Sequence, residues 1–370
     1  MAEVNDPTLL VINPGSTSTK VAIFHGDQIE ASDTLRHDAS AIAAFPKVFD
    51  QFDMRKEAVY RFLDDHSFAP ERLSAVIGRG GVLPPVEGGV YIVDDVLVEA
   101  LYEYGWNHAS SLGALIARDV AGVAGIPAYI ADPVTTDELD DIARITGLPE
   151  IERRSVFHAL NQKAVARRAA LALGREYHEC NLIVVHLGGG ISVGGHRRGR
   201  VVEVSNALDG EGPYAPERSG SLPSTGVVKL CFSGTYTERE IRKKITGQGG
   251  LVAYLGTNSL LDVENRIAAG DEYARLCYEG MAYQVAKEIG RVACGMSGDV
   301  DAIVITGGAA NSAMLVGLIT GRVEFIARVL LYPGEEEMRA LAQAAMRALA
   351  GLERARRMSP PVTGPKSVPR

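Results

Sequence analysis

The residues with the clearest capacity for chemistry lie in one short turn near the start of the chain. Residues 9–12 form an apolar run, and β-branched side chains recur in alternation over residues 20–24. The two segments predict two strands joined by a hairpin turn. The turn carries an amide, hydroxyls and an ammonium group, from Asn13, Ser16, Ser18 and Lys20. Because a bare turn needs little more than Gly15, the additional donors favour binding of a polyanion such as a phosphate chain. An ordinary polar turn is the alternative.

A second glycine-rich turn repeats the pattern in the other half of the chain. Residues 181–205 are typical of three strands joined by two turns, and His186 lies at the end of the first strand. The turn that follows it consists of Gly188, Gly189 and Gly190. Glycines let a backbone approach a ligand closely. The repetition indicates an internal duplication, and two lobes with a phosphate loop each would hold a nucleotide between them.

Charged side chains follow other expected strands. Arg79, followed by Gly80 and Gly81, ends a strand over residues 72–78, and Asp132 ends a strand over residues 128–131. Open α/β sheets bind ligands at such strand ends. Arg218 lies in a Gly- and Pro-rich loop over residues 206–226, and loops longer than about 15 residues are usually functional or disordered.

The elements expected to position these residues alternate between strands and helices, so we predict an α/β fold. Besides the hairpins, we expect helices over residues 42–51, 54–66, 94–104, 112–122, 159–174, 272–295 and 335–358, and strands over 28–35, 301–305 and 323–329. Residues 302–321 carry no charge and are long enough to span a bilayer, but their glycines and Asn311 favour a buried strand, a turn and a helix.

Composition excludes several classes of protein. The 370 residues suffice for two domains, and 46% hydrophobic and 23% charged residues are typical of a globular α/β protein. A net charge of −8 argues against general nucleic-acid binding. The four cysteines have neither metal-binding nor disulfide-scaffold spacing, and the first eight residues lack the basic start of a signal peptide. We therefore expect a cytoplasmic protein with no membrane or nucleic-acid partner.

Taken in order, the motifs resemble those of a known family. Three segments carry the resemblance: NPGSTSTK from Asn13, HLGGG from His186 and TGG from Thr306. They look like the phosphate-one, phosphate-two and adenosine motifs of the acetokinase family, which belongs to the actin and sugar kinase superfamily. The likeness extends over residues 8–357. Pro14, the Arg79-Gly80-Gly81 sequence and the YPGE stretch from Tyr332 make the chain more similar to the butyrate kinases of that family than to its acetate kinases.

The resemblance implies a fold and a reaction. The fold would be two ribonuclease H-like domains of the actin-like ATPase type with a nucleotide cleft between them. The domains would cover residues 1–155 and 156–334, the first completed by a helix over 335–357, with a disordered tail over 359–370. The reaction would move the γ-phosphoryl group of ATP reversibly to the carboxylate of a short-chain fatty acid, with Mg²⁺ as cofactor and ADP and an acyl phosphate as products. A homodimer or a higher homo-oligomer is also implied.

The resemblance assigns roles to individual residues as well. Arg79 and Arg218 would clamp the acceptor and the transferring group, His158 would donate to the phosphoryl group, and Asp132 would orient the site or the metal. Phosphate and nucleotide contacts would come from Asn13, Ser16, Ser18, Lys20, His186, Gly188, Gly189, Gly190, Gly307 and Gly308. Gly80, Gly81, Phe157 and His108 would line the acceptor site. Asn13 and one of Glu336 and Glu337 would serve the metal, and the sequence does not choose between the two glutamates.

Structural explanations compete with these roles. The arginines could be surface residues beside loops, and His158 could be a helix cap or a core histidine. Structural roles are nearly as plausible for His108 and His186. A glutamate at a helix start is expected for the helix dipole alone. Ser16, Ser18 and Lys20 are the strongest candidate ligands, because the turn has no other need for them.

One departure from the acetate kinases concerns the acceptor. Those enzymes have bulky β-branched residues where Gly80 and Gly81 stand, so we expect the glycines to enlarge the acyl pocket and favour butyrate or a branched four- or five-carbon acid. Two more buried methylene groups contribute about 1.6 kcal/mol, or roughly tenfold in specificity.

Three other functions are compatible with the sequence. The chain could be an acetate or propionate kinase, or a sugar or polyol kinase of the same superfamily with Asp132 as base. Outside the enzymes, it could be an actin-like nucleotide-gated assembly protein. Paired arginines aimed at an acceptor favour a carboxylate kinase, because a neutral sugar does not call for them.

Overall fold

The computed structural model describes residues 6–104 and 108–359, and the chain divides into two compact units. The first unit joins Met1–Thr136 to Glu336–Arg370, and the second comprises Asp137–Glu335. The sequence placed these boundaries after residues 155 and 334. The disorder predicted for residues 359–370 lies, apart from Ser359, outside the described residues.

The first unit is built on a six-stranded sheet with the strand order β3-β2-β1-β4-β6-β5. Its strands are β1 (Thr8–Pro14), β2 (Ser18–His25), β3 (Gln28–Arg36), β4 (Ala75–Arg79), β5 (Val90–Ile92) and β6 (Ala128–Ala131). The pair β1 and β2 forms the predicted antiparallel hairpin. Strand β4 runs parallel to both β1 and β6, so the carboxyl ends of these three strands lie next to one another.

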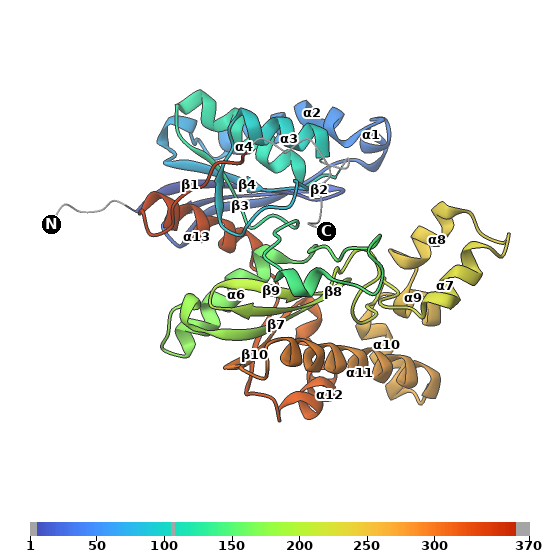
Figure 1. Ribbon diagram of the computed structural model, residues 1–370. Coiled ribbons are helices and arrows are strands. Elements are labelled where there is room, and N and C mark those ends of the chain that lie inside the picture. Colours follow the sequence, from blue (N-terminus) through green and yellow to red (C-terminus); the bar gives the residue numbers. More distant parts are fainter. Residues whose placement is uncertain (1–5, 105–107, 360–370) are drawn as a thin grey trace. The chain divides into compact units, whose positions relative to one another are not determined.

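Helices cover both faces of this sheet (Figure 1). They are α1 (Ala39–Ala43), α2 (Phe52–Asp65), α3 (Asp95–Tyr104), α4 (Ser111–Ala124) and α13 (Glu337–Leu349), with 3₁₀ turns at Val48–Gln51 and Pro70–Arg72. Helices α2, α3 and α4 lie on one face and α13 on the other. Both α4 and α13 pack against β1 and β4. The strands that end at the candidate site are therefore buried between two helices.

The second unit contains a five-stranded sheet with the order β11-β10-β7-β8-β9. Its strands are β7 (Asn181–Leu187), β8 (Ile191–Arg197), β9 (Arg200–Val204), β10 (Ala302–Gly307) and β11 (Val329–Pro333). Read from β9, this order repeats that of β3-β2-β1-β4-β6, with an antiparallel three-stranded meander followed by two parallel strands. The shared topology agrees with the internal duplication predicted from the two turns.

The two faces of the second sheet pack against different helices. The helices are α5 (Asp141–Arg144), α6 (Ala159–Ala172), α7 (Ser224–Cys231), α8 (Glu238–Ile245), α9 (Gly250–Leu255), α10 (Leu260–Ala268), α11 (Glu272–Gly295) and α12 (Ala313–Val323), with 3₁₀ turns at Tyr177–Glu179 and Gly308–Asn311. Ile183 and Val185 pack with residues of α11, whereas Leu182 and Val184 pack with residues of α6. All four residues are apolar because their strand, β7, is covered by helices on both faces of the sheet.

Three expected elements differ in the structure. The helix expected over residues 42–51 is broken at Phe45-Pro46, since a proline disfavours helical geometry in the residue before it. The strand expected over 323–329 begins only at Val329, because α12 continues to Val323. The helix expected to reach residue 358 ends at Leu349, two residues before Gly351, whose φ of 70° is left-handed.

The uncharged segment 302–321 forms β10, a 3₁₀ turn and most of α12, as predicted. Within the described part of the chain, every helix is too short or too polar to cross a bilayer.

Candidate active site

The hairpin turn of the first unit presents its polar side chains on one face. Asn13 lies opposite Lys20 in the β1–β2 register, and Ser18 is two residues before Lys20 on β2. Residues paired across a hairpin share a face, as do residues two apart on a strand. Ser16 and Lys20 are exposed and Ser18 is half-buried. Among the residues that the structure describes, their hydroxyl and ammonium groups have no hydrogen-bond partner, so they are available to an anion.

A buried arginine that sequence reasoning missed holds this turn from behind. Arg55, on α2, is fully buried and donates to the carbonyl oxygens of Gly15 (2.9 Å), Ser16 (2.9 Å) and Ser18 (3.1 Å). It also donates to Thr19 Oγ1 at 3.1 Å and to Gln51 Oε1 at 2.9 and 3.0 Å. In the described residues no carboxylate pairs with Arg55, and burial lowers the pKa of its guanidinium.

Arg55 could have been recognised from helical spacing. It lies three residues before Ala58 and four before Val59, which are both buried on the same face of α2. A charged residue on the apolar stripe of a helix indicates a buried polar contact. The sequence does not show which backbone atoms it meets.

The ends of three parallel strands bring together residues from distant parts of the sequence. Asn13 is in β1, Arg79 ends β4, and Asp132 directly follows β6. Asn13 Nδ2 donates to Glu337 Oε2 at 2.8 Å, and Arg79 forms an ion pair with Glu337 Oε1. Glu336 is the exposed residue just before α13 and makes no side-chain cap hydrogen bond to that helix. The geometry thus places Glu337, rather than Glu336, beside Asn13 and Arg79.

Asp132 is held in an unusual backbone conformation. Its φ is 39° and its side chain is almost fully buried. One carboxylate oxygen accepts from the backbone N–H of Gly89 at 2.7 Å, while the Asp132 N–H donates to the Gly89 carbonyl at 3.0 Å. This exchange ties the end of β6 to the start of β5 and fixes the direction of the carboxylate.

The two glycines after Arg79 have local reasons to be glycine. Gly81 has a φ of 68°, and a Cβ there would lie 2.5 Å from Ser111. A Cβ on Gly80 would lie 3.0 Å from Ile130 and Pro133. Local packing is therefore one reason for their small size, and their effect on the acyl pocket stays a prediction. His108, which was also expected at the acceptor site, contacts solvent and hydrogen-bonds Ser110 at 2.6 Å. Partial burial lowers the pKa of His108, and the charge of Arg79 is the second cause.

In the second unit, the loop that carries Arg218 lies against the glycine turn. A Cβ on Gly190 would lie 2.2 Å from the Arg218 guanidinium, so Gly190 permits a close approach. The Glu217 N–H donates to the Gly189 carbonyl at 3.3 Å, and Arg218 donates to the Ala207 carbonyl at 2.7 Å. Burial lowers the pKa of Arg218, and the neighbouring Glu217 offsets part of that effect.

The other predicted residues of this unit fall into two groups. His158 and His186 have stacked rings with centroids 3.8 Å apart. Gly307 ends β10 beside Leu187, and a Cβ on Gly308 would meet no atom within 4 Å. Phe157, by contrast, is 3% exposed and packs in a small core with Leu139, Ala159, Val201 and Val204. Its position supports a packing role.

The donor set of the first unit fits a magnesium ion held largely by phosphate and water. Asn13 donates through Nδ2 to Glu337, and its Oδ1 accepts no hydrogen bond from the described residues. Described residues contain no cluster of three or more His, Cys, Asp or Glu side chains able to hold a metal. Mg²⁺ typically binds through one or two carboxylates plus waters and substrate phosphates, so one carboxylate beside one amide oxygen suffices.

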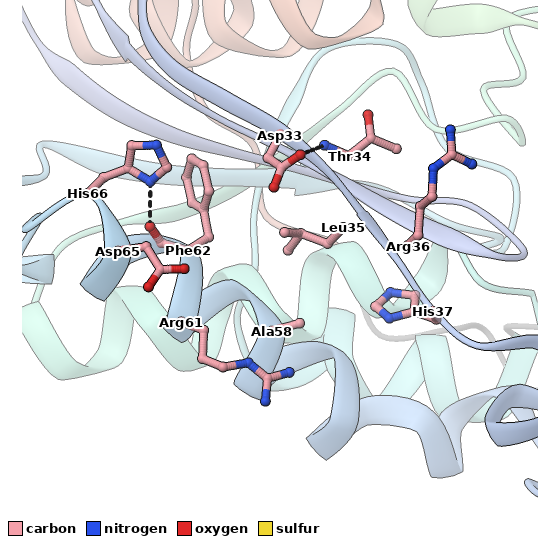
Figure 2. Close-up of a pocket in the computed structure, with 10 residues that line it drawn as sticks. All are labelled: Asp33, Thr34, Leu35, Arg36, His37, Ala58, Arg61, Phe62, Asp65 and His66. Atoms are coloured by element: carbon pink, nitrogen blue, oxygen red, sulfur yellow. Dashed lines mark hydrogen bonds between the residues drawn. The ribbon is translucent and has the colours of Figure 1, made fainter.

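A separate hollow lies between β3 and α2 of the first unit and is shown in Figure 2. Its lining includes Arg36, His37 and Arg61 together with Asp33 and Asp65. None of the predicted site residues lines it.

Comparison with solved structures defines the class of fold. The acetate kinase of Porphyromonas gingivalis has a TM-score of 0.76 at 18% identity and covers 93% of this chain and 100% of that one. The ROK hexokinase of Thermus thermophilus has a TM-score of 0.51 at 14% identity and covers 93% of this chain and 99% of that one. The fold is therefore that of the actin-like ATPases, which confirms the predicted α/β class.

Sequence comparison then defines the family. Residues 150–338 match the acetokinase family. Over 350 residues the chain is 50% identical to butyrate kinase 2 of Clostridium acetobutylicum, with 94% of this chain and 98% of that protein covered. The chain belongs to the acetokinase family, as its ordered motifs predicted.

Proposed function

We propose that this protein transfers the γ-phosphoryl group of ATP, reversibly, to the carboxylate of a short-chain fatty acid, giving an acyl phosphate and ADP. The observation that carries the proposal is the near full-length relationship to butyrate kinase 2 at 50% identity. The site geometry supports it, because each unit combines a turn rich in anion donors with an arginine close to that turn or to its strand.

The acceptor chemistry explains why arginines matter more than a base. A fatty acid with a pKa of about 4 to 5 is ionised at neutral pH, so no proton must be removed from it. What the reaction requires is relief of the repulsion between the carboxylate and the polyphosphate, together with in-line positioning. We assign these tasks to Arg79 and Arg218, whose planar guanidinium groups suit both carboxylate and phosphoryl oxygens. His158 donates a hydrogen bond to the transferring group.

The phosphates of the nucleotide bind at the two turns. Ser16, Ser18 and Lys20 contribute donors that the described protein leaves unused. In the second turn the Gly188 N–H donates to the Gly190 carbonyl at 3.1 Å, so the donors come from Gly189 and Gly190. Gly308 leaves open space where the nucleoside would lie. Mg²⁺, held by Asn13 and Glu337 together with phosphate and water, supplies charge neutralisation of the phosphate chain.

The proposed metal role separates the two adjacent glutamates. Glu337→Gln removes the carboxylate that meets Asn13 and Arg79, so we expect the Mg²⁺ concentration for half-maximal activity to rise roughly tenfold. Glu336→Gln, one residue earlier on the exposed helix start, is the matched control and should leave it within about twofold. Equal effects of the two substitutions would remove Glu337 from the metal site.

Substrate range is tested with a panel of acids from acetate to hexanoate, each with ATP, Mg²⁺ and hydroxylamine to trap the acyl phosphate. We expect the highest kcat/KM with butyrate or a branched four- or five-carbon acid. A maximum at acetate or propionate would favour the acetate kinase alternative. Product from a sugar or polyol alone would favour a sugar kinase, and ATP-dependent filaments without any product would favour an assembly protein.

The oligomeric state and the compartment stay predictions. A homodimer is expected from the family, and light scattering after size-exclusion chromatography measures it directly.

A further inference from the structure

A continuous chain of buried hydrogen bonds leads to His158 from the interior of the second unit. Tyr177 Oη lies 2.8 Å from His196 Nδ1, and His196 Nε2 lies 3.0 Å from Gln162 Oε1. Gln162 Nε2 donates to Ser192 Oγ at 2.9 Å, and Ser192 Oγ lies 2.8 Å from His158 Nδ1. Gln162, Ser192 and His196 are each 0% exposed, so water does not substitute for any link.

One backbone carbonyl sets the direction of the whole chain. The side-chain amide of Gln162 lies 3.1 Å from the carbonyl oxygen of Ser192, which can only accept a hydrogen bond. The nitrogen of that amide must therefore face Ser192, because the reverse orientation would put two oxygens in contact. With the nitrogen there, the Gln162 oxygen faces His196 and can only accept.

The direction then passes through His196. Its Nε2 must carry a hydrogen to donate to Gln162, so its Nδ1 accepts from the hydroxyl of Tyr177. Burial is the main cause that lowers the pKa of His196 well below its usual value, followed by the charges of Lys163 and Arg167. A neutral ring is what this arrangement of one donor and one acceptor requires.

The same logic fixes the proton of His158. Ser192 Oγ receives one amide hydrogen of Gln162, and His158 Nδ1 is the other group that the structure places within hydrogen-bond distance of it. Because Ser192 is 0% exposed, its hydroxyl hydrogen needs an acceptor within the protein, and among the described contacts that acceptor is His158 Nδ1. In a neutral His158 ring, the proton must then be on Nε2.

A stacked neighbour fixes the plane of the ring as well. The rings of His158 and His186 are inclined by 11° with centroids 3.8 Å apart. His186 is in turn held between Asn161 Oδ1 at 2.9 Å and Glu335 Oε1 at 3.1 Å. His158 is thus constrained in both tilt and rotation.

We propose that Ser192, Gln162, His196 and Tyr177 are positioning residues that hold His158 as the Nε2–H tautomer, with its donor presented to an anionic group. If the proposed function holds, that group is the transferring phosphoryl group. The inference about which nitrogen carries the proton stands on the geometry, whereas its consequence for catalysis rests on the proposed function.

The tautomer is measured directly by ¹⁵N–¹H correlation spectra of protein labelled in its histidine rings. The signals of His158 are identified by their loss in His158→Asn, among the 8 histidines of the chain. At a pH well above the usual imidazole pKa of about 6.5, we expect a protonated Nε2 and an unprotonated Nδ1. An Nδ1–H ring in the full-length protein would overturn the proposal.

The Ser192→Ala variant removes the hydroxyl that sets the tautomer. We expect its His158 signals to move toward the average of two exchanging tautomers, and Gln162→Leu provides the same test if Ser192→Ala does not fold. The matched control is Ser205→Ala, which removes a buried hydroxyl with no hydrogen-bond partner among the described residues. Unchanged His158 signals in both Ser192→Ala and Gln162→Leu would overturn the proposal.

Kinetics then distinguish positioning from general stability. Ser192→Ala should lower kcat about tenfold or more while leaving KM for ATP nearly unchanged, whereas Ser205→Ala should change neither. A rise in KM without a fall in kcat would contradict the positioning role. Because the spectra need no substrate, a correct tautomer in a protein that forms no acyl phosphate would defeat the proposed function and leave this inference intact.

Discussion

At the scale of single residues, the anion-binding turn of the first unit has two kinds of contributor. Ser16, Ser18 and Lys20 could be predicted from sequence, because a turn has little other use for so many donors. Arg55 could not be assigned to the turn, since it meets three carbonyl oxygens from a helix that begins about thirty-five residues later, a contact that only tertiary folding creates. Its buried charge has no carboxylate partner in the described chain.

Replacing Arg55 with Met should lower the free energy of unfolding by about 3 kcal/mol, because buried carbonyl oxygens lose their donors. It should also raise KM for ATP, since the turn loses its support. Chemical denaturation and initial rates measure the two effects. Arg61→Met, on the exposed side of the same helix, is the matched control and should change stability by less than about 0.5 kcal/mol. Similar losses of stability in both variants would show that the effect comes from changing helix α2 and not from the hydrogen bonds of Arg55 to the turn.

The hydrogen-bond chain that leads to His158 also depends on tertiary contacts. The sequence identified His158 as a candidate but left a helix cap and a core histidine open. The structure places it at the start of α6 without a side-chain cap hydrogen bond, with its Nδ1 hydrogen-bonded to Ser192 of strand β8. Contacts between residues this far apart follow from strand register and helix packing, which local patterns do not determine.

At the scale of elements, strongly patterned segments were predicted well. The two glycine turns lie between antiparallel strands, and Arg79 and Asp132 lie at strand ends as expected. The last helix is shorter than predicted because residues after Gly351 return to the sheet, where the Arg356 N–H donates to the Val90 carbonyl at 2.8 Å. The amphipathic pattern of the helix continues past Gly351 in the sequence. Nothing in the local sequence shows that this segment pairs with the edge strand β5 instead of staying helical.

Gly81 belongs to this scale, because it lies against Ser111, the first residue of helix α4. Gly81→Ala would force a side chain into a left-handed backbone and against Ser111, so we expect a loss of about 1 to 3 kcal/mol in unfolding free energy. The preference for butyrate over acetate should not change. Gly122→Ala, at a helix position where a Cβ meets no atom within 4 Å, should be neutral or stabilise by up to about 1 kcal/mol.

A stable Gly81→Ala protein with a preference shifted toward acetate would support the sequence-based explanation, in which this glycine enlarges the acyl pocket. Thermal or chemical denaturation together with kcat/KM for the two acids separates the two explanations.

At the scale of the whole molecule, the chain repeats one sheet topology in two units and gives each a glycine turn. A net charge of −8 on a protein that binds anionic substrates means that attraction must come from local groups such as Lys20, Arg79 and Arg218. The duplication could be predicted from sequence because the turn motifs recur. The shared strand order required the structure, since strand pairing across distant segments leaves no periodic signal.

The central claim is that a carboxylate accepts the γ-phosphoryl group. The most direct test follows ATP, Mg²⁺ and butyrate by ³¹P NMR during incubation with the full-length protein. We expect butyryl phosphate and ADP to appear in equal amounts, and the reverse reaction to regenerate ATP from these two products. Formation of ADP with inorganic phosphate alone, or no conversion beyond that seen without butyrate, would contradict the account.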